Sequence, residues 1–430
     1  MIGGDLFKKS AKALLIKVVG SLLAFLLSIT LARFLSPDEM GSYFLALMIL
    51  TILSVVCRFG LENVLLRKTA ESALENSNDK IQIVFSGALI LVMIIGGVIT
   101  LLTYVFSQFI ADVVFKNISL ADDIKVMSIG IVPLAFIYLT GASLKGVQLI
   151  GRAQAVESLA LPLPIITMLL IITCFVGTQP TLQEIEAMYV AGLFLSVGIC
   201  LWVWFKSTGV NFTWPKIEEY GKLIKDGTPL LTVSVINILM AWQTTFLLGV
   251  ISTAEEVAVY NIALRIAMLG SFILSAVNSA SAAKFAGLYR AGDMIGLQKV
   301  AFQATCLSTL FSLPVLLAFI VIPHEIVSLY GTAYQQASDV LIILTIGQLA
   351  SVLTGSVGQL LIMSGNAAYL KNSILIGVLV QFMMALFLIP LYGAMGAAVA
   401  EASCALIINV IAAIYVKKKL KIKSTLLGIL

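Results

Sequence analysis

Runs of about twenty apolar residues recur along the whole 430-residue chain. At ~1.5 Å per residue, a helix of roughly 20 residues crosses the ~30 Å hydrocarbon core of a bilayer. The chain is 60% hydrophobic and 11% charged, whereas soluble domains average roughly 25% charged residues. So few charges cannot cover a water-facing surface, so the sequence predicts an integral membrane protein. Because the runs are continuous and rich in Leu, Ile and Ala, helices are expected rather than a barrel of alternating strands.

The apolar runs predict an all-α polytopic fold with about twelve transmembrane helices. Six runs precede the polar stretch 206–226 and six follow it, so we expect two six-helix lobes, residues 1–210 and 211–430. The first run has the basic start of a signal peptide, but it exceeds the ~7–15 residues of an h-region and is expected to stay uncleaved. The expected helices are 13–34, 40–60, 81–106, 126–147, 154–176, 185–205, 228–250, 257–282, 300–321, 338–363, 373–390 and 395–416.

Lysine and arginine are distributed unevenly between the connections of these helices. With twelve helices, 22 of the 27 basic residues fall on one side of the membrane and 3 on the other. Short basic loops stay in the cytoplasm, so both termini are predicted to be cytoplasmic. The same rule explains the net charge of +5, and it makes the basic tail 417–423 an anchor beside anionic lipid rather than a nucleic-acid site.

A short sequence repeat links the two halves. Segments 36–47 (SPDEMGSYFLAL) and 253–264 (TAEEVAVYNIAL) share a hydroxyl residue, two acids, a tyrosine and Ala-Leu at the same spacing. The acids are expected to cap the N-termini of the helices that follow, with ligand contact as the alternative. Because six helices separate the segments, the repeat is parallel, an arrangement typical of transporters whose lobes alternate around a site.

Several segments resemble a known family. Residues 31–43 (LARFLSPDEMGSY) resemble the opening signature of bacterial polysaccharide exporters of the Wzx type. Segments 330–337 (YGTAYQQA), 365–366 and 388–400 (LIPLYGAMGAAVA) are similar to their last helices, so the resemblance covers essentially the whole chain. It implies a transporter of the MATE/MOP superfamily, with two lobes around a central cavity. The implied function is flipping of undecaprenyl-diphosphate-linked oligosaccharide across the bacterial cytoplasmic (inner) membrane by alternating access.

The resemblance also implies the setting of that function. Members serve the biosynthesis of O-antigen in lipopolysaccharide, of capsule or of exopolysaccharide, so polysaccharide polymerase and chain-length proteins are candidate partners. MurJ-type lipid II flippases carry two further C-terminal helices, which this sequence does not show. MATE drug exporters often carry an acid deep in the first or seventh helix, whereas here Asp226 borders the seventh. A MATE-like multidrug or cation antiporter remains the alternative.

Charged residues inside helices are the candidate site residues, because each costs at least ~2.5–3.5 kcal/mol at the centre of a membrane helix. Arg265 lies ~12 Å into its helix and offers a planar fork to phosphate oxygens. Its alternative role is an ion pair with Glu401, itself a candidate for proton coupling. Lys17, Arg58 and Arg33 are weaker candidates for diphosphate or sugar contact, and Arg58 can instead pair with Glu62 at i,i+4.

The sequence contains no catalytic motif. P-loop and GxSxG patterns are absent, and the five cysteines and single histidine show no metal spacing. We therefore expect a transporter rather than an enzyme, with no metal and no cofactor. The energy for transport could come from coupling to H+ or Na+, from a lipid gradient or from consumption of the product, and the sequence leaves these open.

Overall fold

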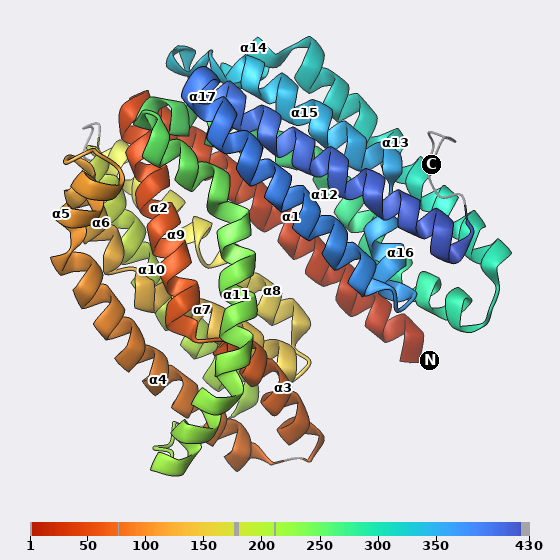
Figure 1. Cartoon of the computed structure of the whole chain (residues 1–430). Coiled ribbons are helices and arrows are strands. Elements are labelled where there is room, and N and C mark those ends of the chain that lie inside the picture. The colour runs from red at the N-terminus through yellow and green to blue at the C-terminus, as the bar shows by residue number, and fades with distance from the viewer. Residues whose placement is uncertain (1, 76, 176–179, 210–211, 423–430) are drawn as a thin grey trace. The chain divides into compact units, whose positions relative to one another are not determined.

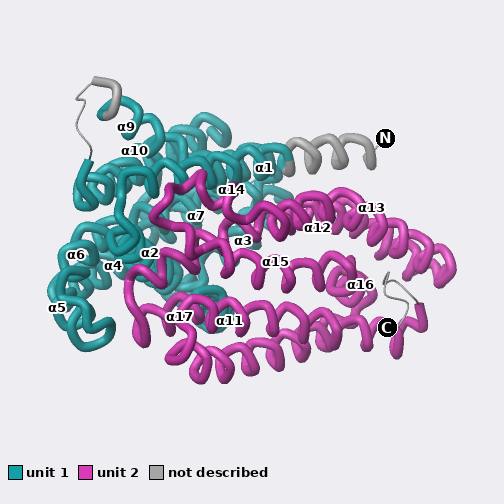
Figure 2. The backbone as a smooth tube through the Cα atoms, turned by 90° about the horizontal axis from the view of Figure 1, so that it is seen from above, with its two compact units in different colours: residues 1–242 teal, residues 243–430 magenta. Residues whose placement is uncertain are grey.

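A computed structural model describes residues 2–75, 77–175, 180–209 and 212–422, although the side chains of 2–12, 14 and 173–175 are not described. Within these ranges all regular structure is helical (Figure 1). The chain divides into two compact units, Met1–Trp242 and Gln243–Leu430 (Figure 2). The sequence divides the lobes at 210/211 instead, and that division stays a prediction.

Unit 1 holds the first eleven α-helices, the last of which continues into unit 2. They are α1 (Ile2–Phe34), α2 (Pro37–Arg58), α3 (Leu61–Leu74), α4 (Asn78–Val105), α5 (Ser107–Phe109), the π-helix η1 (Ile110–Val114), α6 (Leu120–Ser128), α7 (Ile131–Gly146), α8 (Ile150–Leu159), α9 (Pro162–Phe175), α10 (Leu182–Thr208) and α11 (Ile217–Ile251).

Unit 2 begins near the end of α11. Its helices are α12 (Ala254–Arg290), α13 (Met294–Val321), α14 (Pro323–Val327), the 3-10 helix η2 (Thr332–Tyr334), α15 (Ala337–Thr354), α16 (Val357–Met363) and α17 (Ala367–Leu420). The pairs α12–α13, α12–α15 and α15–α17 pack closely along their lengths.

The described helices account for the membrane spans predicted from the sequence. Ten of them are long and apolar enough to cross a bilayer, and α6 with α7, bent by 44°, makes another. The 54-residue α17 is two helices joined at Gly393, whose φ of 52° and ψ of −129° are not helical. Each of the twelve predicted segments overlaps one of these spans, and the all-α polytopic fold is confirmed.

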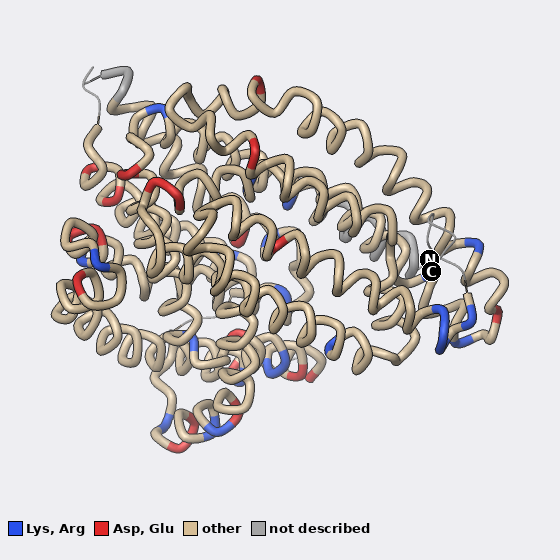
Figure 3. Tube along the Cα trace, turned by 45° about the horizontal axis from the view of Figure 1, so that its top comes forward, with Lys and Arg blue, Asp and Glu red and all other residues tan. Residues whose placement is uncertain are grey.

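The predicted ends of the helices are less accurate than their positions. Helix α11 begins at Ile217 inside the stretch expected to be a polar linker, and α12 continues to Arg290. Helix α3 occupies a stretch expected to be a loop. These segments are too polar for hydropathy to detect, yet a helix that leaves the hydrocarbon layer needs no apolar side chains. Figure 3 shows the charged residues gathered at helix ends and connections, with long helical stretches free of them.

The two repeat segments begin α2 and α12, and the capping role of their acids is confirmed. Ser36 and Glu39 form a complete capping box, in which the Ser36 backbone N–H donates to the Glu39 carboxylate at 2.8 Å. Thr253 accepts from the Glu256 backbone N–H at 3.4 Å. The Glu256 carboxylate instead accepts from the backbone N–H of Ala394 at 2.5 Å, directly after the break in α17. The second copy therefore caps two helices.

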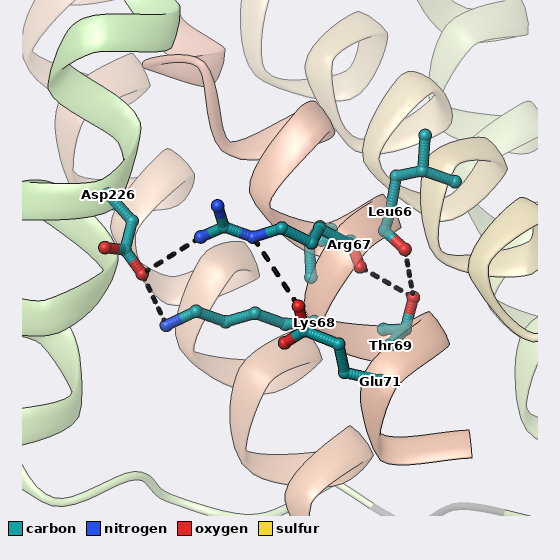
Figure 4. Close-up of polar contacts among 7 residues, drawn as sticks. Leu66, Arg67, Lys68, Thr69, Glu71 and Asp226 are labelled. Carbon is teal, nitrogen blue, oxygen red and sulfur yellow. Dashed lines mark hydrogen bonds and ion pairs between the residues drawn. The ribbon is translucent and has the colours of Figure 1, made fainter. Parts of the chain in front are cut away.

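Helix α3 is attached to α11 by charge. Asp226 of α11 lies 2.7 Å from Lys68 Nζ and 3.7 Å from the Arg67 guanidinium (Figure 4). Beside this cluster the chain turns at Gly60, whose φ of 71° favours glycine. A side chain on Gly60 would meet the Gly227 carbonyl oxygen at 2.5 Å. Asp226, the acid bordering the seventh span, is thus held by two cations.

Candidate functional site

A polar cavity of about 390 Å³ lies within unit 1. Helices α2, α3, α7 and α8 supply most of its wall, and Ile238 of α11 completes it. The wall is unusual for an apolar bundle because it carries two cations and two carboxylates. Its polar side chains are Thr51, Ser54, Arg58, Glu62, Asn63, Tyr138, Lys145 and Glu157.

Arg58 stands at the C-terminal end of α2, where the helix dipole favours a cation. Its side chain is only 9% exposed, and one terminal nitrogen lies 2.6 Å from the Glu62 carboxylate. The guanidinium also lies 4.4 Å from the centre of the Tyr138 ring, a cation–π contact. The ion pair at i,i+4 that the sequence allowed is therefore formed.

Two buried polar atoms beside this ion pair lack a protein partner. Among the described residues, neither Arg58 Nε nor Ser54 Oγ makes a hydrogen bond. Leaving a buried donor unsatisfied costs roughly 1–3 kcal/mol. An oxygen-rich ligand in the cavity would remove that cost.

A second ion pair faces the same cavity. Lys145 of α7 lies 2.7 Å from the Glu157 carboxylate of α8. Gly141 makes room for this approach, because a side chain there would meet a Glu157 carboxylate oxygen at 2.5 Å. The cavity therefore holds two cation–carboxylate pairs, each from neighbouring segments of the chain.

This arrangement suits an anionic ligand that exchanges with carboxylates. With both pairs closed, the cavity carries no net formal charge, which limits the electrostatic cost of the empty site. Phosphate oxygens can replace the carboxylates on an arginine fork and a lysine ammonium. Asn63, Thr51 and Tyr138 add neutral groups of the kind that hydrogen-bond sugar hydroxyls.

Of the four cations predicted as substrate contacts, only Arg58 lines this cavity. Lys17 is exposed on α1, and Arg33 is exposed near the end of the same helix. Arg265 is half-buried on α12 in unit 2. The structure does not bring these four residues together within one unit.

Glu401 forms a polar network of its own in unit 2. Its carboxylate accepts hydrogen bonds from Gln381, from Thr244 at 3.4 Å and from Tyr260 at 3.4 Å. Gln381 also donates to Thr244 at 2.8 Å. All three donors are neutral and buried, and Tyr260 is the tyrosine of the repeat. Whether this acid carries protons stays a prediction.

Sequence reasoning missed several groups that the fold brings together. Nothing in the sequence pairs Lys145 with Glu157, because a contact across the α7–α8 turn has no i,i+4 signal. Sequence reasoning also missed Glu186 of α10, which is fully buried with no hydrogen-bond partner for either carboxylate oxygen among the described residues. Asp123 of α6 lies near enough for its charge to act on Glu186.

Residues 6–283 match the family described as polysaccharide biosynthesis protein, which is well over half of the chain. The chain belongs to this family. Residues 229–387 also match the MatE family. The resemblance to polysaccharide exporters is thus confirmed by membership of this family.

Individual relatives agree with the family assignment. The probable low-salt glycan biosynthesis flippase Agl15 of Haloferax volcanii is 24% identical over 97% of this chain and 85% of its own length. The probable multidrug resistance protein NorM of Rhizobium meliloti is 27% identical over 31% of this chain and 28% of its own length.

Solved structures of other transporters share this fold. An inward-facing MATE multidrug resistance transporter of the MOP superfamily superposes with a TM-score of 0.75 at 14% identity, over 95% of this chain and 98% of the other. The lipid II flippase MurJ in an inward closed conformation superposes with a TM-score of 0.76 at 15% identity, over 94% of this chain and 87% of the other.

Replacing Glu186 by Met is expected to raise the thermal stability of the purified protein. The change removes two buried oxygens that have no hydrogen-bond partner among the described residues and fills the space with an apolar side chain, so a gain of roughly 1–2 kcal/mol is expected. Glu184→Gln is the control, because Gln preserves the capping box that Glu184 forms with Thr181. A clear loss of stability in Glu186→Met, measured by thermal unfolding in detergent, would contradict this account.

Proposed function

We propose that this protein flips an undecaprenyl-diphosphate-linked oligosaccharide across the bacterial cytoplasmic membrane by alternating access, for the synthesis of O-antigen, capsule or exopolysaccharide. Family membership and the glycan flippase of Haloferax volcanii support this class of function. It is a transport function rather than an enzymatic one. Both termini of the chain would lie in the cytoplasm. Polymerase and chain-length proteins would receive the product.

The observation that carries the proposal is the pair of exchangeable ion pairs in the unit 1 cavity. A diphosphate needs several cationic and hydroxyl donors in a protected site, and Arg58, Lys145 and Ser54 supply them. Glu62 and Glu157 hold the cations while the site is empty. On release of the diphosphate the carboxylates return, which avoids leaving buried cations without a counter-charge.

The predicted topology places this cavity on the side from which the substrate comes. Arg58 ends α2 and Lys145 ends α7, and the distribution of basic residues assigns both ends to the cytoplasm. We therefore assign Arg58 and Lys145 to capture of the diphosphate from the cytoplasmic leaflet. We assign Arg265, deeper along its own span, to a later contact with the phosphates. We assign Lys17, in the middle of α1, and Arg33, in its last turn, to weaker contacts.

Arg58→Ala is expected to reduce surface polysaccharide at least tenfold, since a hydrogen bond to a charged group contributes roughly 1.5–3 kcal/mol. Arg58→Lys should retain part of the activity, because it keeps the charge but loses the planar fork. Lys80→Ala is the control, since it removes an exposed cation that is also ion-paired, at 2.6 Å from Glu75. Normal polysaccharide in Arg58→Ala at wild-type protein levels would refute capture at this site.

Arg265→Ala is expected to abolish export while leaving the protein in the membrane, and Arg265→Lys should be partly active. Arg290→Ala, at the exposed end of the same helix, is the control and should export normally. The measurement is surface polysaccharide per amount of protein. Full activity of Arg265→Ala would remove this residue from the phosphate path.

A MATE-like antiporter is the second candidate, favoured by the MatE match over residues 229–387 and by the Glu401 network. It predicts that Glu401→Gln abolishes dye efflux with normal surface glycan. The flippase proposal predicts that wild-type protein causes no dye efflux beyond that of cells lacking it. Thr244→Val, which removes one of the donors to Glu401, serves as a packing control.

A further inference from the structure

A second cavity of unit 1, of about 460 Å³, runs along α8, α9 and α10. Its floor includes the buried side chains of Val156 and Ala160, and its rim includes Leu163, Ile199 and Trp202. These three rim residues are 42%, 44% and 60% exposed. Exposed apolar side chains on a membrane-spanning segment suit contact with acyl chains, so this cavity is a groove that an acyl chain can occupy.

The sequence creates this groove by interrupting a span. Helix α8 ends at Leu159 and α9 begins at Pro162, with Pro164 following. Proline disfavours helical backbone in the residue before it, which separates the two helices. Ser196 of α10 donates a hydrogen bond to the carbonyl of Ala160 at this break. The interruption is therefore fixed to α10.

Two cations stand at one end of the groove, where α8 begins and α10 ends. They are Arg152 and Lys206, both exposed. Lys206 Nζ lies 4.6 Å from the centre of the Trp202 ring. Neither cation forms an ion pair with a carboxylate of the described residues, whereas Arg58 and Lys145 each do. The groove thus offers positive charge that no carboxylate of the described residues neutralises.

A third cavity of unit 1 provides a comparison within the same protein. It measures about 570 Å³, lies against α4, α7 and α10, and is also mainly apolar. Its wall contains no charged side chain. An apolar hollow of this protein can therefore lack cations altogether, as this one does, whereas the groove carries Arg152 and Lys206.

We propose that this groove binds one anionic phospholipid of the cytoplasmic leaflet. The lipid phosphate contacts Arg152 and Lys206, and one acyl chain lies along Val156, Ala160 and Leu163. Basic pockets between transmembrane helices on the cytoplasmic side bind anionic head groups. Tryptophan is enriched at the membrane–water interface, and Trp202 lies beside the Lys206 ammonium. The distribution of basic residues assigns both cations to that side.

The size of the groove favours a phospholipid over the carrier lipid of the proposed substrate. The groove has a volume of about 460 Å³ and lies at the break between the short helices α8 and α9. An acyl chain is short enough to lie there, whereas a polyprenyl chain is several times longer. This inference does not depend on the proposed transport function.

The test uses the full-length protein in nanodiscs of phosphatidylcholine, into which phospholipids brominated on the acyl chain are titrated. Bromine quenches nearby tryptophan fluorescence, so Trp202 reports occupancy and Trp202→Phe identifies its share of the signal. Brominated phosphatidylglycerol is expected to quench at a mole fraction at least tenfold lower than brominated phosphatidylcholine. The double variant Arg152→Gln, Lys206→Gln should raise that mole fraction roughly 10- to 30-fold.

Matched variants separate this site from general attraction to an anionic membrane. Arg290→Gln with Lys299→Gln removes two exposed cations elsewhere and should leave the quenching curve unchanged. Arg152→Lys keeps the positive charge and should retain most of the preference for phosphatidylglycerol over phosphatidylcholine. Equal quenching by both phospholipids, or an unchanged curve in the groove variant, would overturn the proposal. Displacement of phosphatidylglycerol by polyprenyl phosphate at lower mole fraction would overturn it in favour of the carrier lipid.

Discussion

A cation inside an apolar helix bundle must be balanced, and the pairing of Arg58 with Glu62 meets that requirement in the wall of a cavity. The two side chains lie 2.6 Å apart, and the Arg58 guanidinium lies over the Tyr138 ring. Lys145 and Glu157 form a second such pair in the same wall. Because each cation has a carboxylate partner from the protein itself, it is paired both before a phosphate binds and after the phosphate leaves. The transport proposal depends on this property.

The internal repeat shows how a duplicated unit acquires different tasks. Glu39 completes a local capping box, whereas Glu256 reaches the N-terminus of the helix after Gly393. Tyr43 packs against the ring of Tyr189, whereas Tyr260 donates to Glu401. The same residue types at the same spacing therefore support packing in one unit and a buried polar network in the other.

The sequence predicted the spans well because long apolar runs leave a membrane helix few alternatives. It predicted the capping role of the acids at the start of α2 and the Arg58–Glu62 pair for a similar reason, since both are local in the chain. It could not predict that Lys145 meets Glu157, because that contact depends on the turn between α7 and α8 and on the space left by Gly141. The burial of Glu186 and the start of α11 at Ile217 likewise depend on packing rather than on composition.

The most direct test of diphosphate capture is photo-cross-linking of the lipid-linked oligosaccharide to the unit 1 cavity. A photoreactive amino acid replaces Asn63, which lines the polar cavity, or Tyr104, which lines the apolar cavity against α4. We predict a cross-link from position 63 that excess pyrophosphate reduces, and none from position 104. Equal labelling at both positions, or no labelling at position 63 in an active protein, would contradict the account.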